Sequence, residues 1–250
     1  MKTIFITGAT SGIGKACAEL FAKQGNRLII CGRRKEILEE LKQKLSTLTA
    51  VYTLSFDVRN QQDVQNAIDS LPADWKNIDI LINSAGDAHG MNQLDEGEIA
   101  DWDAMMDGNV KGLLYVSQPI IKIMKARQTG HIINLSSIAG REIYPGGVVY
   151  CASKHAVEAI SEGMRLELTG FGVKVTNIQP GAVETEFSFV RFKGDAARAA
   201  KVYEGFQPLV AEDIANAIAY CVNAPAHVTI ADICIMPSAQ ASVTTTYRKS

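Results

Sequence analysis

Tyr150 and Lys154 are the residues whose types and spacing could together perform acid-base chemistry. On a helix, a separation of four residues places the phenol and the ammonium on one face, one above the other. A free phenol has a pKa of about 10, and a desolvated cation beside it lowers that pKa because it stabilises the phenolate. We therefore expect Lys154 to bring the pKa of Tyr150 toward the working pH, where the phenol can exchange a proton with an alcohol.

Ser137 lies upstream of Tyr150 and could donate a hydrogen bond to the same substrate oxygen. The alternative is that a Tyr and a Lys four apart only decorate an amphipathic helix and take no part in chemistry. These three residues alone leave both interpretations open. The elements that would position them, and the other motifs, favour the first.

The length and composition of the chain favour one α/β domain that acts on a small molecule. The 250 residues are 47% hydrophobic, enough for a full core, and we expect a single domain over residues 1–250. The formal charge is -2, with 25 basic and 27 acidic residues spread along the chain. We therefore expect a small-molecule substrate and neither a nucleic-acid nor a membrane partner.

The cysteines and the start of the chain give a second set of expectations. The five cysteines are widely spaced and stand mostly in apolar contexts, so we expect buried free thiols rather than disulfides or a metal site. The apolar segment after Met1 is too short for a signal peptide or a membrane span, and no later apolar run reaches spanning length. We expect a soluble, cytoplasmic protein.

The first motif is a glycine-rich turn between an expected strand at residues 3–7 and an expected helix at residues 15–23. Its glycines follow G-x-x-x-G-x-G, one variant of the dinucleotide fingerprint. Free backbone N–H groups and the positive helix end suit a pyrophosphate, and the missing side chains let phosphates approach closely. An ordinary tight strand-to-helix connection is the alternative. The residues predicted to bind a cofactor here are Gly8, Thr10, Ser11, Gly12, Ile13 and Gly14.

Two arginines follow the second expected strand, residues 27–31. NAD-binding folds usually place an acidic residue at that point, on the ribose 2′-hydroxyl, and this chain lacks it. Arg33 and Arg34 instead predict NADP as the cofactor, because a guanidinium can hold a 2′-phosphate with two hydrogen bonds. The alternative is that both are solvated residues at the start of the helix expected over residues 35–45. The phosphate contact is favoured more for Arg33 than for Arg34.

Two further expected strands, residues 51–56 and 78–82, should end at the same cofactor. Ligands of open parallel sheets bind at the carboxyl ends of the strands. Asp57 is a candidate for the adenine edge, although it could also cap the helix that follows. Small residues after the second of these strands allow the cofactor to lie close. The predicted cofactor residues here are Asp57, Val58, Asn83, Ala85 and Gly86.

The second half begins with a long expected helix, residues 102–124, whose apolar face is interrupted by Asn109. A polar amide on the apolar face of such a helix needs hydrogen-bond partners. It can bind an ordered water, or it can mark a kink or a satisfied core amide. The residue type and position leave these alternatives open.

The remaining elements predict the fold class. An expected strand at residues 132–135 delivers Ser137 to its carboxyl end, an expected helix at residues 148–168 carries the Tyr and Lys, and another strand follows at residues 173–178. Strands and helices alternate along the chain, without repeats or linkers. This alternation predicts an α/β fold, a single doubly wound Rossmann-type parallel sheet of about seven strands flanked by helices on both faces.

The motifs together resemble those of the short-chain dehydrogenase/reductase family along nearly the whole chain. The matching segments are T-G-A-T-S-G-I-G at residues 7–14, N-S-A-G at 83–86, N-V-K-G at 109–112, Ser137, Y-C-A-S-K at 150–154 and P-G at 180–181. Each motif alone is modest, but their order and spacing together are specific. One departure is Ser84, where the family usually has a second Asn.

The resemblance implies a role for each matched residue. Tyr150 would be the general acid/base, Lys154 would lower its pKa and bind the nicotinamide ribose, and Ser137 would position the substrate oxygen. Asn109 would hold a water in a proton relay, and Thr185 would contact the nicotinamide carboxamide. The residues implied at this end of the cofactor are Tyr150, Lys154, Pro180, Gly181, Val183 and Thr185.

Three further stretches resemble the NADP-dependent 3-hydroxy acid dehydrogenases of this family, which act on serine, allo-threonine and related compounds. They are residues 185–194, 225–228 and 235–242. The resemblance implies that the chain interconverts a small 3-hydroxy acid, of the serine or 3-hydroxypropionate type, and its oxidised form, and that it is a homotetramer. Sulfoacetaldehyde reductases and other carbonyl reductases share much of this pattern. A non-enzymatic NADP sensor is a third alternative.

A substrate of this class carries an anion, and Arg191 is our first choice for the residue that binds it. Ser137 and Tyr150 would bind the alcohol at the other end of the same substrate. Arg141 and Lys193 are the other basic residues near the expected site. For each of these three cations, a solvated surface charge is the alternative.

Overall fold

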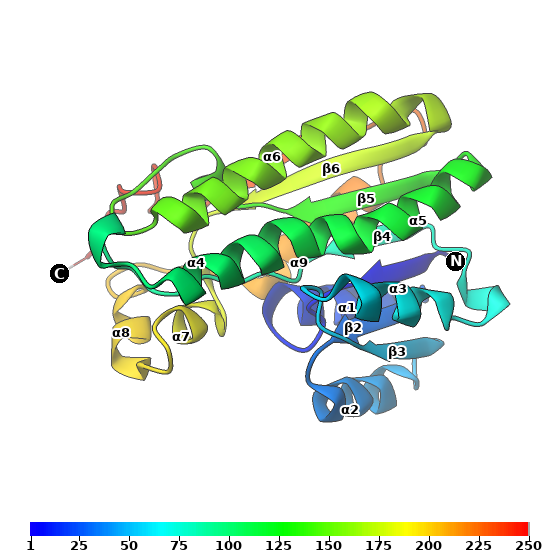
Figure 1. Cartoon of the computed structure of the whole chain (residues 1–250), viewed down its shortest axis with the longest axis horizontal. Coiled ribbons are helices and arrows are strands. Elements are labelled where there is room, and N and C mark those ends of the chain that lie inside the picture. Colours follow the sequence, from blue (N-terminus) through cyan, green and yellow to red (C-terminus); the bar gives the residue numbers. More distant parts are fainter. Residues whose placement is uncertain (250) are drawn as a thin grey trace.

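The computed structural model describes residues 1–249, and its centre is a seven-stranded sheet in the order β3-β2-β1-β4-β5-β6-β9 (Figure 1). Every neighbouring pair of strands in this sheet is parallel. The strands are β1 (Thr3–Ile6), β2 (Arg27–Gly32), β3 (Val51–Ser55), β4 (Ile80–Asn83), β5 (Gly130–Leu135), β6 (Val173–Pro180) and β9 (Asp232–Ile235). Their carboxyl ends therefore lie along one edge, where open α/β sheets bind ligands.

Helices cover both faces of the sheet, as the sequence predicts. Apolar residues of α1, α2 and α9 pack on one face, and those of α3, α5 and α6 pack on the other. The longer helices are α1 (Gly12–Lys23), α2 (Lys35–Leu45), α3 (Gln61–Asp69), α4 (Ile99–Met106), α5 (Leu113–Arg127), α6 (Val148–Leu168) and α9 (Ala211–Val222). Because the sheet is covered on both sides, its strands are near-continuous apolar runs rather than alternating ones. The predicted doubly wound fold is confirmed.

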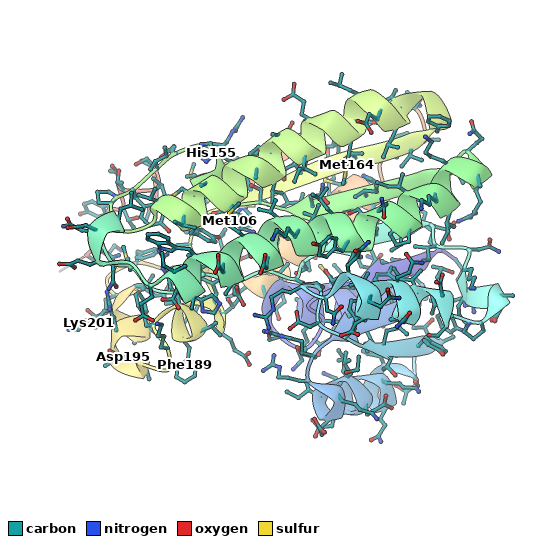
Figure 2. All side chains as sticks on the ribbon, viewed as in Figure 1. Met106, His155, Met164, Phe189, Asp195 and Lys201 are labelled. Carbon is teal, nitrogen blue, oxygen red and sulfur yellow. The ribbon has the colours of Figure 1, made fainter. Side chains whose placement is uncertain are left out.

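A smaller segment lies at the carboxyl edge of the sheet. It consists of β7 (Val183–Glu184), α7 (Phe187–Arg191), α8 (Ala196–Lys201) and β8 (Leu209–Val210), with β7 and β8 paired. Met164 on α6 is buried in a main core, whereas Phe189 on α7 is largely exposed (Figure 2). Val183 and Leu209 pack against one main core, and Phe187 packs against Tyr150, while Phe189 stays exposed. The segment lines the edge where a ligand would bind.

The long helix expected over residues 102–124 differs from the prediction. The structure divides it into α4 and α5, with a π-helix, Asp107–Gly112, between them. Turns of this kind take one more residue than an α-helical turn and are frequent at functional sites. The interruption falls on Asn109, the residue that breaks the apolar face in the sequence.

Within residues 1–249, no helix is long and apolar enough to cross a membrane. The seventh strand, β9, was not located from the sequence. Its side chains alternate between exposed and half-buried at the sheet edge, although the sequence has a short apolar run at residues 233–236.

Candidate functional site

A cavity of about 900 Å³ opens at the carboxyl edge of the sheet, beneath the segment that contains α7 and α8. Most of the predicted site residues line it. They are Gly8, Thr10, Ser11, Gly12, Ile13, Arg33, Arg34, Asp57, Val58, Ala85, Gly86, Ser137, Tyr150, Lys154, Pro180, Gly181, Val183, Thr185 and Arg191. Three predicted residues, Gly14, Asn83 and Asn109, do not line it.

The glycine-rich turn forms one end of this cavity. Gly8 and Gly12 have φ values of +66° and +49°, which side chains rarely tolerate. A Cβ at Gly8 would also lie 3.0 Å from the backbone of Ala85. Ser11, the N-cap of α1, makes no side-chain capping hydrogen bond, so the first N–H groups of α1 are left for a ligand. The turn therefore has the open backbone donors that a pyrophosphate requires.

Gly14 has a different role from the one predicted. A Cβ there would overlap the carbonyl oxygen of Gly8. Its missing side chain allows α1 to pack tightly against the end of β1, behind the cavity rather than in it.

The two arginines after β2 line the same end and are both exposed. Arg33 lies 3.9 Å from Asp57 Oδ2. Arg34 donates from Nη1 to Glu186 Oε2 at 3.1 Å, and from Nε and Nη2 to Thr10 Oγ1 at 3.2 and 3.1 Å. The sequence suggested the phosphate contact mainly for Arg33. The structure places both guanidinium groups at the cavity.

Arg59, which lines the cavity, was not among the predicted residues. It donates to the carboxylate of Asp57 from its backbone and its side chain, with distances from 2.6 to 3.0 Å. Burial raises the pKa of Asp57, but the bonds from Arg59 outweigh that effect and hold the pKa below its usual value. Its position two residues after the Asp at a strand end could have indicated it.

Tyr150 lies at the other end of the cavity and is buried. Burial raises the pKa of the phenol well above its ordinary value, and the nearby Tyr144 raises it further. A hydrogen bond with Ser137 and the charge of Arg191 act in the opposite direction but are smaller. Burial of the ring is the largest of these effects, and the expected lowering of this pKa by Lys154 stays a prediction.

Lys154 lies beside Tyr150 on one face of α6, as its spacing predicts. Its Nζ is 5.8 Å from the centre of the tyrosine ring and donates to the carbonyl oxygen of Leu135 at 2.9 Å. Burial lowers the pKa of this ammonium to about 8, and the charges of Asp87 and Glu158 oppose that shift. The lysine is therefore held in place and has a perturbed pKa, a combination common at functional sites.

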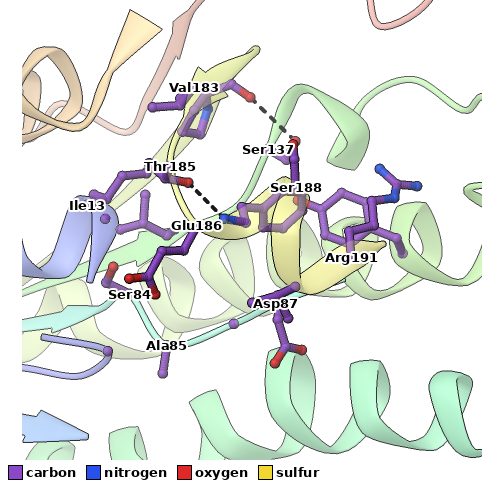
Figure 3. A pocket seen from close by; sticks show the side chains of 18 of the residues that line it. Ile13, Ser84, Ala85, Asp87, Ser137, Val183, Thr185, Glu186, Ser188 and Arg191 are labelled. Carbon is purple, nitrogen blue, oxygen red and sulfur yellow. Dashed lines mark hydrogen bonds between the residues drawn. The ribbon is translucent and has the colours of Figure 1, made fainter. Parts of the chain in front are cut away.

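Ser137 follows β5 and lines the same cavity as Tyr150 (Figure 3). Its Oγ donates to the carbonyl oxygen of Pro180 at 3.4 Å and accepts from the N–H of Ala139 at 3.1 Å. Because the bond to Pro180 is long, the hydroxyl proton can turn toward a closer acceptor in the cavity.

Asn109 and Asn83 lie behind the cavity, and their predicted roles in a water relay and a cofactor contact stay predictions. Asn109 accepts from the N–H of Asp87 and donates to its carbonyl oxygen, both at 2.9 Å, and donates to Ser153 Oγ at 3.0 Å. It is therefore a satisfied core amide that fixes the chain after β4. The amide nitrogen of Asn83 donates to Ser117 and Asn134 inside the protein, both at 2.9 Å.

Arg191 reaches into the cavity from the end of α7 and is half-buried (Figure 3). Its Nε donates to the carbonyl oxygen of Gly90 at 3.2 Å, and its Cζ lies 5.3 Å from the ring centre of Tyr144 and 5.6 Å from that of Tyr150. Its Nη2 is buried and has no partner among residues 1–249. A buried donor without an acceptor costs about 1 to 3 kcal/mol, so this nitrogen favours binding of an acceptor from a ligand.

The other two candidate cations are placed differently. Arg141 is exposed and does not line the cavity. Lys193 forms ion pairs with Glu98 at 3.0 Å and Asp101 at 2.9 Å. Of the three, the structure brings only Arg191 to the catalytic candidates.

Several cavity residues were not predicted as site residues, although Phe187, Val190 and Phe192 lie in the stretch 185–194 that carried a family resemblance. They come from the loop before α6 and from the segments that follow β6, including the C-terminal one, and are Tyr144, Phe187, Val190, Phe192, Val243, Thr244 and Arg248. The C-terminal segment is attached through Gln240, whose Oε1 accepts from the N–H of Ala182 at 2.9 Å. Such tertiary contacts could not be inferred from spacing.

The chain is similar in sequence to a known protein family and to several of its members. The family model described as short chain dehydrogenase matches residues 2–194. The NADP-dependent 3-hydroxy acid dehydrogenase YdfG of Escherichia coli O6:H1 is 44% identical over 238 residues, which are 95% of each chain. Sulfoacetaldehyde reductase 2 of Chromohalobacter salexigens is 42% identical over 239 residues, again 95% of each chain.

Solved structures show the same relationship. The closed form of serine dehydrogenase complexed with NADP+ is 41% identical, with a TM-score of 0.93 over 99% of this chain and 100% of that one. A serine dehydrogenase from Escherichia coli is 38% identical, with a TM-score of 0.83 over 96% of this chain and 99% of that one. By both the matched model and the extent of these identities, the chain belongs to the short-chain dehydrogenase family.

Proposed function

We propose that this protein is an NADP-dependent oxidoreductase that interconverts a small 3-hydroxy acid and its 3-oxo acid or semialdehyde. The observation that carries the proposal is that one cavity is lined both by the acid-base candidate Tyr150 and by Arg191, whose buried Nη2 has no hydrogen-bond partner within residues 1–249. An alcohol and an anion on one small molecule could therefore be bound together. The names of the relatives described above support the same reaction and substrate class.

NADP fits the residues at the exposed end of the cavity. Open N–H groups at the start of α1 suit its pyrophosphate, and Arg33 and Arg34 suit its 2′-phosphate. Gly8, Gly12 and Gly86 line this cavity and allow neighbouring segments to pack closely around it, because a Cβ at each would contact other protein atoms. When bound, the cofactor accepts or supplies the hydride. We further propose that Thr185, Val183, Pro180 and Gly181 contact its nicotinamide end.

Three side chains would then act on the substrate alcohol. Ser137 donates a hydrogen bond to the oxygen and fixes its position. Tyr150 removes the hydroxyl proton during oxidation and returns a proton to the oxygen during reduction. Lys154, held by the Leu135 carbonyl, binds the nicotinamide ribose and supplies positive charge near the phenolate. A mere NADP sensor would need none of these three groups together.

The raised pKa of Tyr150 makes the rates of reduction and oxidation depend on pH in different ways. Burial keeps the phenol in its protonated form at neutral pH. That form is the proton donor, so reduction of the carbonyl compound is favoured near neutrality. Oxidation of the alcohol needs the phenolate and would become faster as the pH rises.

Arg191 would bind the substrate anion. Its side chain lines the cavity, and its Cζ lies 5.6 Å from the ring centre of Tyr150. Its Nη2 is buried without a hydrogen-bond partner within residues 1–249, so it would turn toward the cavity to meet the anion. A carboxylate and a sulfonate could both accept from this nitrogen, so sulfoacetaldehyde reduction is the second candidate. The 42% identity to a protein named for that activity supports keeping it.

The test is an assay of NADPH consumption with a panel of substrates. Malonate semialdehyde, 2-aminomalonate semialdehyde and sulfoacetaldehyde represent the two anion classes, and propanal is a neutral aldehyde of similar size. We expect at least one carboxylate substrate to have the highest kcat/KM. A preference for sulfoacetaldehyde would select the second candidate, and a preference for propanal would refute both.

We also propose that residues 1–250 form one domain, that the protein works in the cytoplasm and that it assembles as a homotetramer. The absence of a membrane-spanning helix within residues 1–249 is compatible with that location. Light scattering coupled to size-exclusion chromatography measures the assembly directly. A mass near that of one 27.1 kDa chain would refute the tetramer.

A further inference from the structure

Glu186 is a charged cavity residue that the proposed reaction does not use. It is the N-cap residue of α7, and its carboxylate lies 3.1 Å from Nη1 of Arg34. The two residues are 152 positions apart in the sequence, and both line the cavity. In Figure 3 the carboxylate points away from Arg191, toward the side of the cavity that Ile13 and Ser84 occupy.

The ion pair joins three loops around the exposed end of the cavity. Thr10 belongs to the glycine-rich turn, Arg34 to the connection after β2, and Glu186 to the connection after β7. Nε and Nη2 of Arg34 both bind Thr10 Oγ1, and Nη1 binds Glu186. A guanidinium has five N–H donors in a fixed plane, and three of those of Arg34 are directed at Thr10 and Glu186. A phosphate that approaches Arg34 from the Nη1 side would compete with Glu186 for that nitrogen.

The other acidic residues that line the cavity have partners of their own. Asp57 is paired with Arg59 at 2.6 Å, and Asp87 is 3.1 Å from His89 Nε2. Glu186 has Arg34 as its cationic partner within residues 1–249. The charge of Glu186 is therefore neutralised by the same guanidinium that is expected to bind a 2′-phosphate.

We propose that Glu186 is a specificity-determining residue, because Glu186 and the 2′-phosphate of NADP are alternative partners of Arg34. The proposal rests on the proposed use of NADP. When NAD binds, the Arg34–Glu186 pair stays intact. When NADP binds, the 2′-phosphate takes the Nη1 side of Arg34 and the pair opens. Glu186 thus reduces the preference for NADP that the arginines alone would give.

The test is the ratio of the dissociation constants for NAD+ and NADP+, measured by calorimetry in low salt, where exposed charges are least screened. Exposed ion pairs are worth about 0.2 to 1 kcal/mol, so we expect Glu186→Gln to increase the preference for NADP+ by about 1.5- to 5-fold. The lost negative charge also favours both cofactors in general, and the ratio removes that shared gain. Glu184→Gln, an exposed carboxylate two residues earlier on β7, is the matched control and should leave the ratio unchanged.

A double-mutant comparison isolates the role of Arg34. In an Arg34→Gln background, Glu186→Gln should no longer change the ratio, because no shared partner remains. The same change in both backgrounds would mean that Glu186 acts only through its general charge, which overturns the proposal. If Glu186→Gln weakened the binding of both cofactors equally, the Arg34–Glu186 pair would help to hold any bound cofactor and would not discriminate between them. If the ratio of dissociation constants did not change, the pair would not affect cofactor choice. Either result overturns the proposal.

The outcome also separates this proposal from the proposed function. A wild-type protein that binds neither cofactor refutes the NADP-dependent function itself. A wild-type protein that prefers NADP+, with a ratio that Glu186→Gln leaves unchanged, refutes only the role of Glu186.

Discussion

The arginines at the two ends of the cavity are the same residue type in opposite surroundings. The side chains of Arg33 and Arg34 are 59% and 42% exposed and already lie beside carboxylates. Arg191 is half-buried between two aromatic rings, and one of its nitrogens has no partner within residues 1–249. Water and salt screen the first two charges, whereas the third acts where screening is weak. We therefore expect small, salt-dependent effects at the exposed end and large effects at the buried end.

The largest effect should come from Tyr150→Phe at the buried end. It removes the transferable proton and preserves the packing of the ring, so turnover should fall by about 10²- to 10⁴-fold while NADP binding changes little. Steady-state kinetics and calorimetric titration of NADP+ measure the two quantities. Turnover within a factor of two of wild type would show that Tyr150 is only a packing residue.

Arg191→Ala should come next. A charge-assisted hydrogen bond contributes about 1.5 to 3 kcal/mol, so KM for the preferred 3-oxo acid should rise by about 10- to 150-fold. KM for a neutral aldehyde of similar size should change far less, because it makes no such bond. Arg141→Ala, which alters an exposed cation outside the cavity, is the control. Equal effects of Arg191→Ala on the two substrates would place the anion site elsewhere.

The dependence of kcat/KM on pH should also test the role of Tyr150 at the buried end of the cavity. Since burial raises the pKa of Tyr150, kcat/KM for reduction should be flat near neutrality and fall only at alkaline pH. For oxidation, kcat/KM should rise with pH by up to about tenfold per unit, because the phenolate is the base. An oxidation profile that is flat between about pH 6 and pH 9 would contradict this assignment.

Arg33→Asp should give the smallest effect, at the exposed end. Removing a screened charge and adding a repulsive one should weaken NADP+ by about tenfold or less and change NAD+ binding little or favour it. The difference should shrink at high salt. Equal use of NADP and NAD by the wild type, judged by kcat/KM, would remove the phosphate role from Arg33.

Local patterns predicted the parts of the site that lie within single motifs. Spacing of four on a helix placed Tyr150 and Lys154 together, and the glycine pattern located the turn at Gly8 and Gly12. The bounds of the helices at residues 35–45 and 148–168 match the expectation. In each case the pattern that identifies the element lies within a few neighbouring residues, so it can be recognised from the sequence alone.

The features that the sequence did not predict depend on distant contacts or on burial. The ion pair between Arg34 and Glu186 joins separate loops, and nothing in the sequence around either residue indicates its partner. The pKa of Tyr150 depends on how deeply the ring is buried, which spacing does not determine. Burial also decided between Arg191 and Lys193, which are two residues apart and equally basic in the sequence.

The π-helix at Asp107–Gly112 makes this part of the chain sensitive to its length. Removing one residue, such as Gly108, would allow the wide turn to relax into an ordinary α-helical one. The deleted residue is the extra one that the wide turn accommodates, so α4 and α5 would keep roughly the same orientation relative to each other. The residues inside the turn would shift, and Asn109 could then no longer hold both backbone groups of Asp87. A single-codon deletion would therefore leave the two helices in place but release the chain that follows β4 from its anchor.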